Sequence, residues 1–132
     1  MHASRTSNGF VFAFLILASP LASAEWTKVG QNSEVTVFYD AKSIQRVGSK
    51  SKMWVLTNFS KPLEIQGRQH QSSKTRFEYD CTDEKSRVDG TYFYALPDGR
   101  GEVTGGDPGV NTWFAVAPKS MGARVMRIAC QK

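Results

Sequence analysis

Apolar and polar side chains alternate with a period of two through the middle of this chain, which is the pattern of antiparallel strands buried on one face. The clearest segment is 75–81, whose apolar positions are Phe77, Tyr79 and Cys81. Its charged positions, which we expect to face water, are Arg76, Glu78 and Asp80. β-branched and aromatic residues predict further strands at 26–29, 34–39, 53–59, 91–96 and 101–104.

Residues that favour turns separate these strands. Pro97, Asp98 and Gly99 predict a tight turn, since proline presets φ and glycine accepts the positive φ that follows. Asp40 is expected to cap one helical turn within 40–46, and Gly90 predicts a β-bulge. Polar composition predicts a loop at 48–51, a longer crossing at 62–71, a hairpin connection at 82–85 and a flexible loop at 105–109.

The periodicity becomes helical at the C-terminal end. Between about 120 and 131, apolar residues at helical spacing form a broad arc made of Met121, Val125, Met126, Ile128 and Ala129. Arg124 and Arg127 occupy the opposite side of this helix. The pattern therefore predicts an α+β fold, in which a curved antiparallel sheet of about six strands carries one C-terminal helix on its concave face.

The first 24 residues have the order of a secretory signal peptide. Arg5 precedes the apolar run 10–17, and residues 22–24 read Ala-Ser-Ala, an A-x-A cleavage site. The run is far shorter than the roughly 20 residues that a membrane-spanning helix needs, although an uncleaved anchor helix is the alternative. We expect cleavage after Ala24, a domain at 25–132, and export to the periplasm or the cell surface. Because Glu25 rather than a cysteine would begin the mature chain, we expect no lipid anchor.

The chain has two cysteines, Cys81 and Cys130. In an oxidising compartment such a pair forms a disulfide by default, which here would hold the C-terminal helix on the sheet. A redox or ligand role is the alternative, but the spacing is not C-x-x-C. A metal site would also need more ligands than two thiols and one histidine supply. We therefore expect no metal and no cofactor.

The net positive charge of the chain favours negatively charged partners. The chain carries 17 Lys and Arg against 12 Asp and Glu, and removing Arg5 leaves 16 against 12, a net charge of +4. A basic exported domain attracts polyanions, whereas export argues against nucleic acid. The candidate partner surface is a set of basic residues in and around the 75–81 segment, namely Arg68, Lys74, Arg76, Lys85 and Arg87. The alternative is a solvated face or strand edge that serves solubility.

No catalytic constellation is evident. His70, the one histidine after the predicted leader, lies in a polar stretch, where we expect it to be solvated rather than to act as a base or ligand. Glu78 and Asp80 fall on a flat strand face, which is a poor place for paired acid and base work. G-x-S-x-G nucleophile motifs are absent. We therefore expect a protein that is not an enzyme.

Aromatic residues cluster in a few segments, at Trp26, at 38–39 with Trp54, and at 92–94 with 113–114. Most are expected to form the core of a small sheet-and-helix domain. If both faces of the 92–94 strand carry rings, some lie on the outer face of the sheet. An exposed aromatic patch would mark a partner surface or a dimer interface, and the oligomeric state stays open.

Several of these features together resemble one family. They are Trp26 and Val29, the run Phe38-Tyr39-Asp40-x-x-Ser43-Ile44, Trp54, a strand ending at Cys81, and Pro118-x-Ser120 leading a helix into Cys130. This arrangement is similar to the surface-adhesin protein E domain, a small exported domain of Gram-negative bacteria. The resemblance covers 26–131. It implies a curved sheet of about six strands with the C-terminal helix joined to it by the disulfide.

The resemblance also implies a function. The member that names the family attaches to host extracellular-matrix proteins, so we expect a non-enzymatic, adhesin-like binding domain with a protein or polyanionic partner. The alternative is a soluble periplasmic accessory protein, such as an inhibitor or an envelope-assembly factor, with an endogenous partner. The missing anchor cysteine leaves both compartments open, and fold alone does not decide between them.

Overall fold

The computed structural model describes residues 9, 13 and 25–131. The predicted leader and its cleavage site therefore lie, apart from residues 9 and 13, outside the described residues. The described elements follow one another along the chain as β1 (Trp26–Gln31), β2 (Val35–Asp40), the 3-10 turn η1 (Ala41–Ser43), β3 (Gln45–Val47), β4 (Lys50–Ile65), β5 (Arg68–Asp80), β6 (Lys85–Tyr94), the 3-10 turn η2 (Pro97–Gly99), β7 (Val103–Asp107), β8 (Phe114–Ala115) and α1 (Met121–Cys130).

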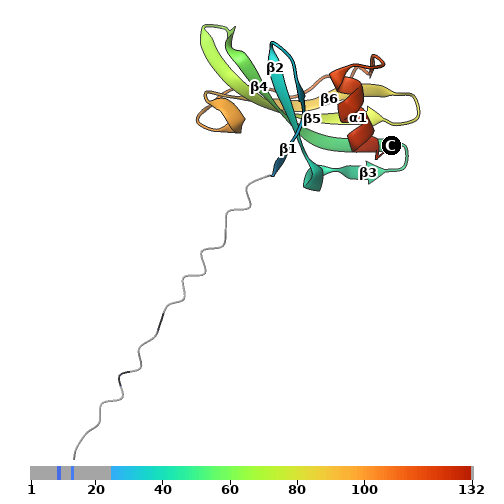
Figure 1. Cartoon of the computed structure of the whole chain (residues 1–132), viewed down its shortest axis with the longest axis horizontal. Helices are drawn as coiled ribbons and strands as arrows, with labels where there is room; N and C mark the ends of the chain where they lie inside the picture. The colour runs from blue at the N-terminus through green and yellow to red at the C-terminus, as the bar shows by residue number, and fades with distance from the viewer. Residues whose placement is uncertain (1–8, 10–12, 14–24, 132) are drawn as a thin grey trace, which may run out of the picture.

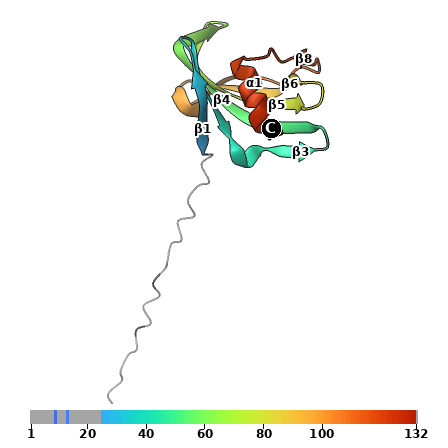
Figure 2. The same cartoon turned by 45° about the vertical axis from the view of Figure 1, so that its right-hand side comes forward.

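The strands form one antiparallel sheet whose main path is β1-β2-β4-β5-β6-β7. Strand β3 pairs with β4, and β8 pairs with β6. The sheet is strongly curved, and α1 lies in the hollow of the curve (Figures 1 and 2). This architecture confirms the predicted α+β fold, with the six strands of the main path extended by two short ones.

Helix α1 closes the core over one face of the sheet, which we call the inner face. Met53 is fully buried there, and Val37, Val55 and Tyr79 pack with it beneath the helix. From the helix, the apolar arc contributes Val125, Met126 and Ala129. The Ser120 hydroxyl accepts a hydrogen bond from the Ala123 N–H at 3.0 Å and so caps the helix. The predicted helix is thus confirmed.

Three links hold the end of the helix on the sheet. The predicted disulfide is present, with the Cα atoms of Cys81 and Cys130 separated by 5.7 Å. The Ser51 hydroxyl donates to the Ala129 carbonyl at 2.6 Å, and the Arg46 guanidinium donates to the Cys130 carbonyl at 2.7 Å. These two bonds satisfy carbonyl groups that have no partner within a helix at its last turn.

Two predicted loops are strands. The 62–71 segment is not a crossing, because β4 runs to Ile65, turns through Gly67 at a φ of 77°, and returns as β5. Gly105, Gly106 and Asp107 belong to β7, where they pair with β6 instead of forming a flexible loop. Polar composition failed here because backbone pairing, rather than burial of side chains, holds both segments in the sheet.

The predicted turns are confirmed. The Asp40 side chain accepts from the Lys42 N–H at 3.0 Å and caps η1. Pro97 begins η2. Gly90 has a φ of 122° and lies where the β5–β6 register shifts, so that Asp89 and Gly90 together oppose Arg76. This is the expected β-bulge, at a φ that favours glycine.

Candidate functional site

The face of the sheet turned away from α1, which we call the outer face, carries large polar and aromatic side chains. Strand alternation sends Lys74 and Arg76 to this face, because their neighbours Thr75 and Phe77 point inward. Residues directly opposite in an antiparallel ladder share a face. Trp54 opposes Arg76, and Tyr92 opposes Lys74, so both rings also lie on the outer face.

Four aromatic side chains on this face form what we call the ring cluster, namely Trp26, Trp54, Tyr92 and Tyr94. The rings of Trp54 and Tyr92 stack with their centroids 6.2 Å apart and their planes at 24°. Together with Asp40 and Lys74, the ring cluster lines a cavity of about 290 Å³. Tyr92 is half exposed, so solvent reaches these rings.

Cations lie over the rings. The Lys74 Nζ is 5.1 Å from the centroid of Tyr94 and 5.7 Å from that of Trp26. The Arg76 Cζ is 5.7 Å from the centroid of Trp54. These distances are within the range of favourable cation–π attraction. The ring cluster is therefore held in place by charges from the neighbouring strand β5.

Next to the ring cluster, basic and acidic side chains form an ion-pair lattice. Arg76 Nε lies 2.9 Å from Asp89 Oδ2, and Lys52 Nζ lies 3.2 Å from the same oxygen. Glu78 joins the lattice through Arg87 at 2.9 Å and Lys52 at 3.6 Å. Burial opposes ionisation of Asp89, but Lys52 and Arg76 outweigh it and hold the pKa of that carboxyl below its usual value.

The lattice ends in a second aromatic contact. The Arg87 Cζ lies 4.7 Å from the ring centroid of Trp113, and the Lys50 Nζ lies 5.7 Å from it. Lys50 also pairs with Asp80 at 3.5 Å. Two hydrogen bonds from the Asp83 and Thr82 N–H groups add to this attraction and lower the pKa of the Asp80 carboxyl.

The structure brings together four of the five predicted partner-surface residues. Lys74, Arg76, Lys85 and Arg87 lie on the outer face, with Lys85 opposite Asp80 at the start of β6. Arg68 is separate, because it lies six residues from Lys74 along β5, roughly 20 Å in an extended strand. There its guanidinium pairs with Glu102 at 3.3 Å.

Two predictions about titratable side chains are wrong. His70 is not a solvated loop residue: it belongs to β5, is 3% exposed, hydrogen-bonds Thr104 through Nδ1, and has its ring 5.0 Å from that of Phe93. Glu78 is not in water either, since it is only 7% exposed. Both are buried because side chains from neighbouring strands cover them.

Sequence reasoning missed several members of the outer face. Asp89 and Lys52 were not singled out, although they join the ion pairs of Arg76 and Glu78. Asp40 was predicted only as a helix cap, yet it also lines the ring-cluster cavity. In 53–59, Trp54 alternates with the core positions Met53 and Val55. This alternation is the sequence signal that could have predicted an aromatic ring on the outer face.

Neither a metal centre nor a membrane helix is found among the described residues. No group of three or more His, Cys, Asp or Glu there could hold a metal ion. Within 25–131, moreover, no helix is both long and apolar enough to cross a membrane.

Comparison with known proteins identifies the family. The family model described as surface-adhesin protein E matches residues 26–131. This chain belongs to that family. Among curated proteins, no sequence relative matches the chain. Membership in the surface-adhesin protein E family makes the chain an adhesin-like surface binding protein, with partners in the envelope or the host, and places it among exported proteins.

Solved structures of the family show the same fold. A crystal form of Haemophilus influenzae protein E aligns with a TM-score of 0.66 at 16% identity, covering 83% of this chain and 89% of that one. A second structure of H. influenzae protein E gives a TM-score of 0.63 at 15% identity, covering 83% and 86%. Protein E from non-typeable H. influenzae gives 0.60 at 16% identity, covering 83% and 77%.

Proposed function

We propose that the outer face is the adhesive surface and that the ring cluster is its centre. Tryptophan, tyrosine and arginine are the residues that carry most of the binding energy at protein interfaces. The observation that supports the proposal is that Trp26, Trp54, Tyr92 and Tyr94 gather beside Arg76 on the sheet face that α1 leaves uncovered. In this proposal the face binds its partner and catalyses no reaction.

The partner class follows from the charges. Arg76 and Arg87 already pair with carboxylates at 2.9 Å, so these cations are partly neutralised before any partner arrives. A polyanion would have to compete with Asp89 and Glu78, whereas a protein surface with its own mixed charges can join the lattice. We therefore propose a protein partner for this face.

Replacing Tyr92 with alanine should weaken partner binding about 30-fold, because hot-spot truncations cost about 2 kcal/mol or more. Tyr92 is half exposed, so this variant should retain its fold, and Trp54→Ala provides a second test. The measurement is surface plasmon resonance against immobilised extracellular-matrix proteins, the partner class that the family resemblance predicts. Phe114→Ala is the matched control, because its exposed ring opposes Ser86 on the inner side of the sheet.

If Tyr92→Ala and Trp54→Ala bind as the wild type does, or if Phe114→Ala loses as much affinity as they do, the ring cluster is not part of the interface. A polyanion would behave differently. Its binding would fall steeply with salt, as counterion release requires, and would be lost in Lys85→Ala but not in Tyr92→Ala.

We also propose that the leader is cleaved after Ala24 and that the 25–132 domain is displayed at the cell surface. The composition of residues 1–24 and the family of the chain support this proposal. Protease shaving of intact producing cells should trim the protein while a periplasmic control stays whole, and mass spectrometry should find Glu25 at its N-terminus. Protection until the outer membrane is opened would instead indicate a periplasmic protein with an endogenous partner.

A further inference from the structure

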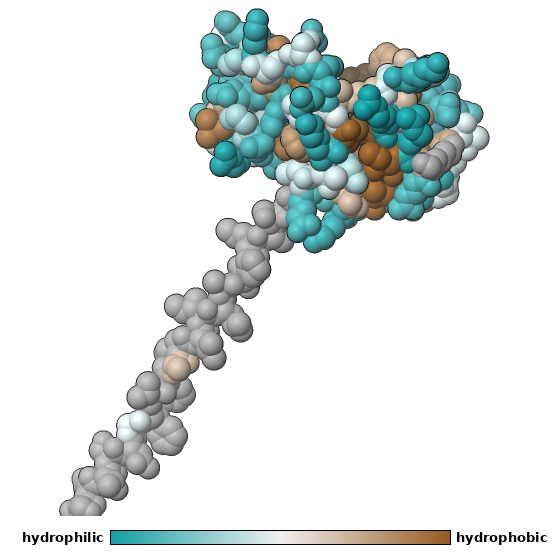
Figure 3. Space-filling view, viewed as in Figure 1, coloured by the Kyte–Doolittle hydropathy of each residue, from teal (hydrophilic) through white to brown (hydrophobic). Residues whose placement is uncertain are grey.

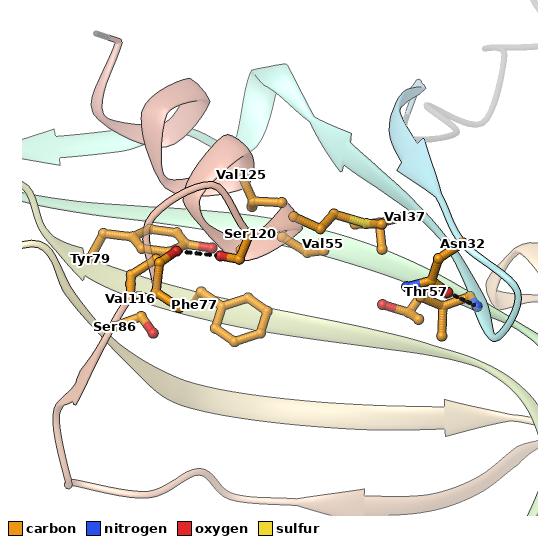
Figure 4. Close-up of a pocket in the computed structure, with 14 residues that line it drawn as sticks. Asn32, Val37, Val55, Thr57, Phe77, Tyr79, Ser86, Val116, Ser120 and Val125 are labelled. Atoms are coloured by element: carbon orange, nitrogen blue, oxygen red, sulfur yellow. Dashed lines mark hydrogen bonds between the residues drawn. The ribbon is translucent and has the colours of Figure 1, made fainter.

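A second cavity lies on the opposite side of the sheet, between α1 and the inner face. Its volume is about 380 Å³, at the lower end of the roughly 300–1,000 Å³ of small-molecule sites. Apolar side chains from the strands and the helix line most of it, among them Val37, Val55, Phe77, Val116 and Val125 (Figure 4). Apolar surface also gathers beside α1, with hydrophilic side chains around it (Figure 3).

The cavity extends along the strands. Tyr79 at one end pairs with Ser51, and Thr57 at the other pairs with Ser73, so the ends lie six residues apart along the strands. That spacing corresponds to roughly 20 Å. An apolar cavity of about 380 Å³ that extends this far along the strands is suited to an extended hydrocarbon chain.

One end of the cavity has hydrogen-bond donors without acceptors. Tyr79 and Ser86 oppose each other across β5 and β6, and both line the cavity. Tyr79 is 3% exposed, yet within 25–131 neither its hydroxyl nor that of Ser86 has a hydrogen-bond partner. The Tyr79 ring reaches into the cavity towards Ser120 (Figure 4). Both hydroxyls line the cavity, so both are free to donate to a ligand that carries an acceptor.

The charge preference of this end is for an anion. Ser120, Met121 and Gly122 line the cavity at the start of α1, a helix of 10 residues. The Ser120 hydroxyl already accepts from the Ala123 N–H, but the N–H groups before it have no intrahelical acceptor, and the helix dipole favours negative charge there. Burial raises the pKa of the Tyr79 hydroxyl, which keeps it protonated and able to donate. At the other end, the Oδ1 of Asn32 already accepts from the Glu34 and Val35 N–H groups.

We propose that this cavity binds a free fatty acid. Its carboxylate accepts hydrogen bonds from the Tyr79 and Ser86 hydroxyls beside the start of α1, and its chain follows Phe77 and Val55 towards Val35. The site is separate from the proposed adhesive surface because the sheet lies between them. Failure of one proposal therefore leaves the other standing.

Titration calorimetry of the full chain, purified after export, tests this with dodecanoate below its micelle concentration. We expect saturable binding of one dodecanoate per chain, about tenfold weaker in Tyr79→Phe because a hydrogen bond to a charged group is lost. The Tyr39→Phe variant, which loses a hydroxyl on a residue that does not line the cavity, should bind as the wild type does. Dodecyltrimethylammonium has the same chain and no acceptor, so it should bind more weakly and should not respond to Tyr79→Phe.

Val116→Trp provides an independent test that does not alter the hydroxyls. Val116 is half-buried on the segment before α1 and lines the cavity, so a large ring there should abolish dodecanoate binding while thermal unfolding stays cooperative. The proposal is overturned if dodecanoate does not saturate, if Val116→Trp binds normally, or if Tyr79→Phe binds as tightly as the wild type. Preferential binding to dilauroyl phosphatidylcholine vesicles over the free acid would also overturn it, in favour of a bilayer lipid.

Discussion

Replacing both Cys81 and Cys130 with alanine should lower the free energy of unfolding by about 4 kcal/mol. The two cysteines are 49 residues apart in sequence, and breaking their link frees a loop of that length in the unfolded chain. The loss should be visible as a lower urea midpoint in equilibrium unfolding followed by circular dichroism. Because Cys130 is the last residue of α1, we also expect the helix to lose protection from hydrogen exchange before the strands do.

Adding a reductant to both proteins provides the control for this experiment. A reductant should shift the wild-type midpoint towards that of the double variant and should leave the double variant unchanged. A difference of less than about 1 kcal/mol between the two proteins would mean that the hydrogen bonds of Ser51 and Arg46 to the last turn of α1 suffice to hold it. The disulfide would then be dispensable for stability.

Met53→Ala should cost about 3 kcal/mol, within the roughly 2–5 kcal/mol that large-to-small core substitutions cost. Met53 is fully buried and lies in β4 beneath α1, where it packs with Val125 and Ala129. Truncation removes apolar contacts from both the sheet and the helix, and the disulfide limits how far the helix can move to fill the space. Urea unfolding at constant m-value measures the effect.

Val47→Ala is the matched control for this substitution. Val47 is 78% exposed on the short strand β3, so its truncation should change stability by no more than about 0.5 kcal/mol. Equal losses in Val47→Ala and Met53→Ala would show that the helix–sheet layer is not where the stability of this domain resides. A larger m-value change in Met53→Ala would point to a less compact native state.

Residue pattern predicted the elements that depend on local chemistry. Alternation in 75–81 placed Phe77 and Tyr79 on the buried face, and both pack in the core. The helical spacing after Ser120 predicted α1 and the face that it buries. Gly90 predicted a bulge because glycine is the residue that most readily adopts a positive φ. Asp40 predicted a cap because few side chains can accept a hydrogen bond from the first N–H groups of a helical turn.

Pattern alone did not locate the strands of polar composition or the buried polar groups. His70 and Glu78 look solvated because their sequence neighbours are polar, but burial depends on what the rest of the chain places over them. Thr104 and Phe93 reach His70 from β7 and β6, and Arg87 reaches Glu78 from β6. Such contacts join residues far apart in sequence, so no local period records them.

The residue pattern was therefore sufficient to predict which residues alternate, which turn, which cysteines can pair and which family the chain resembles. Which side chains meet depends instead on how the whole chain folds. The order and register of the strands gather Trp26, Trp54, Tyr92 and Tyr94 into one cluster, and the helix leaves an apolar cavity that Tyr79 lines. Strand pairing sets which residues stand opposite one another, and the curvature of the sheet sets how close its ends come.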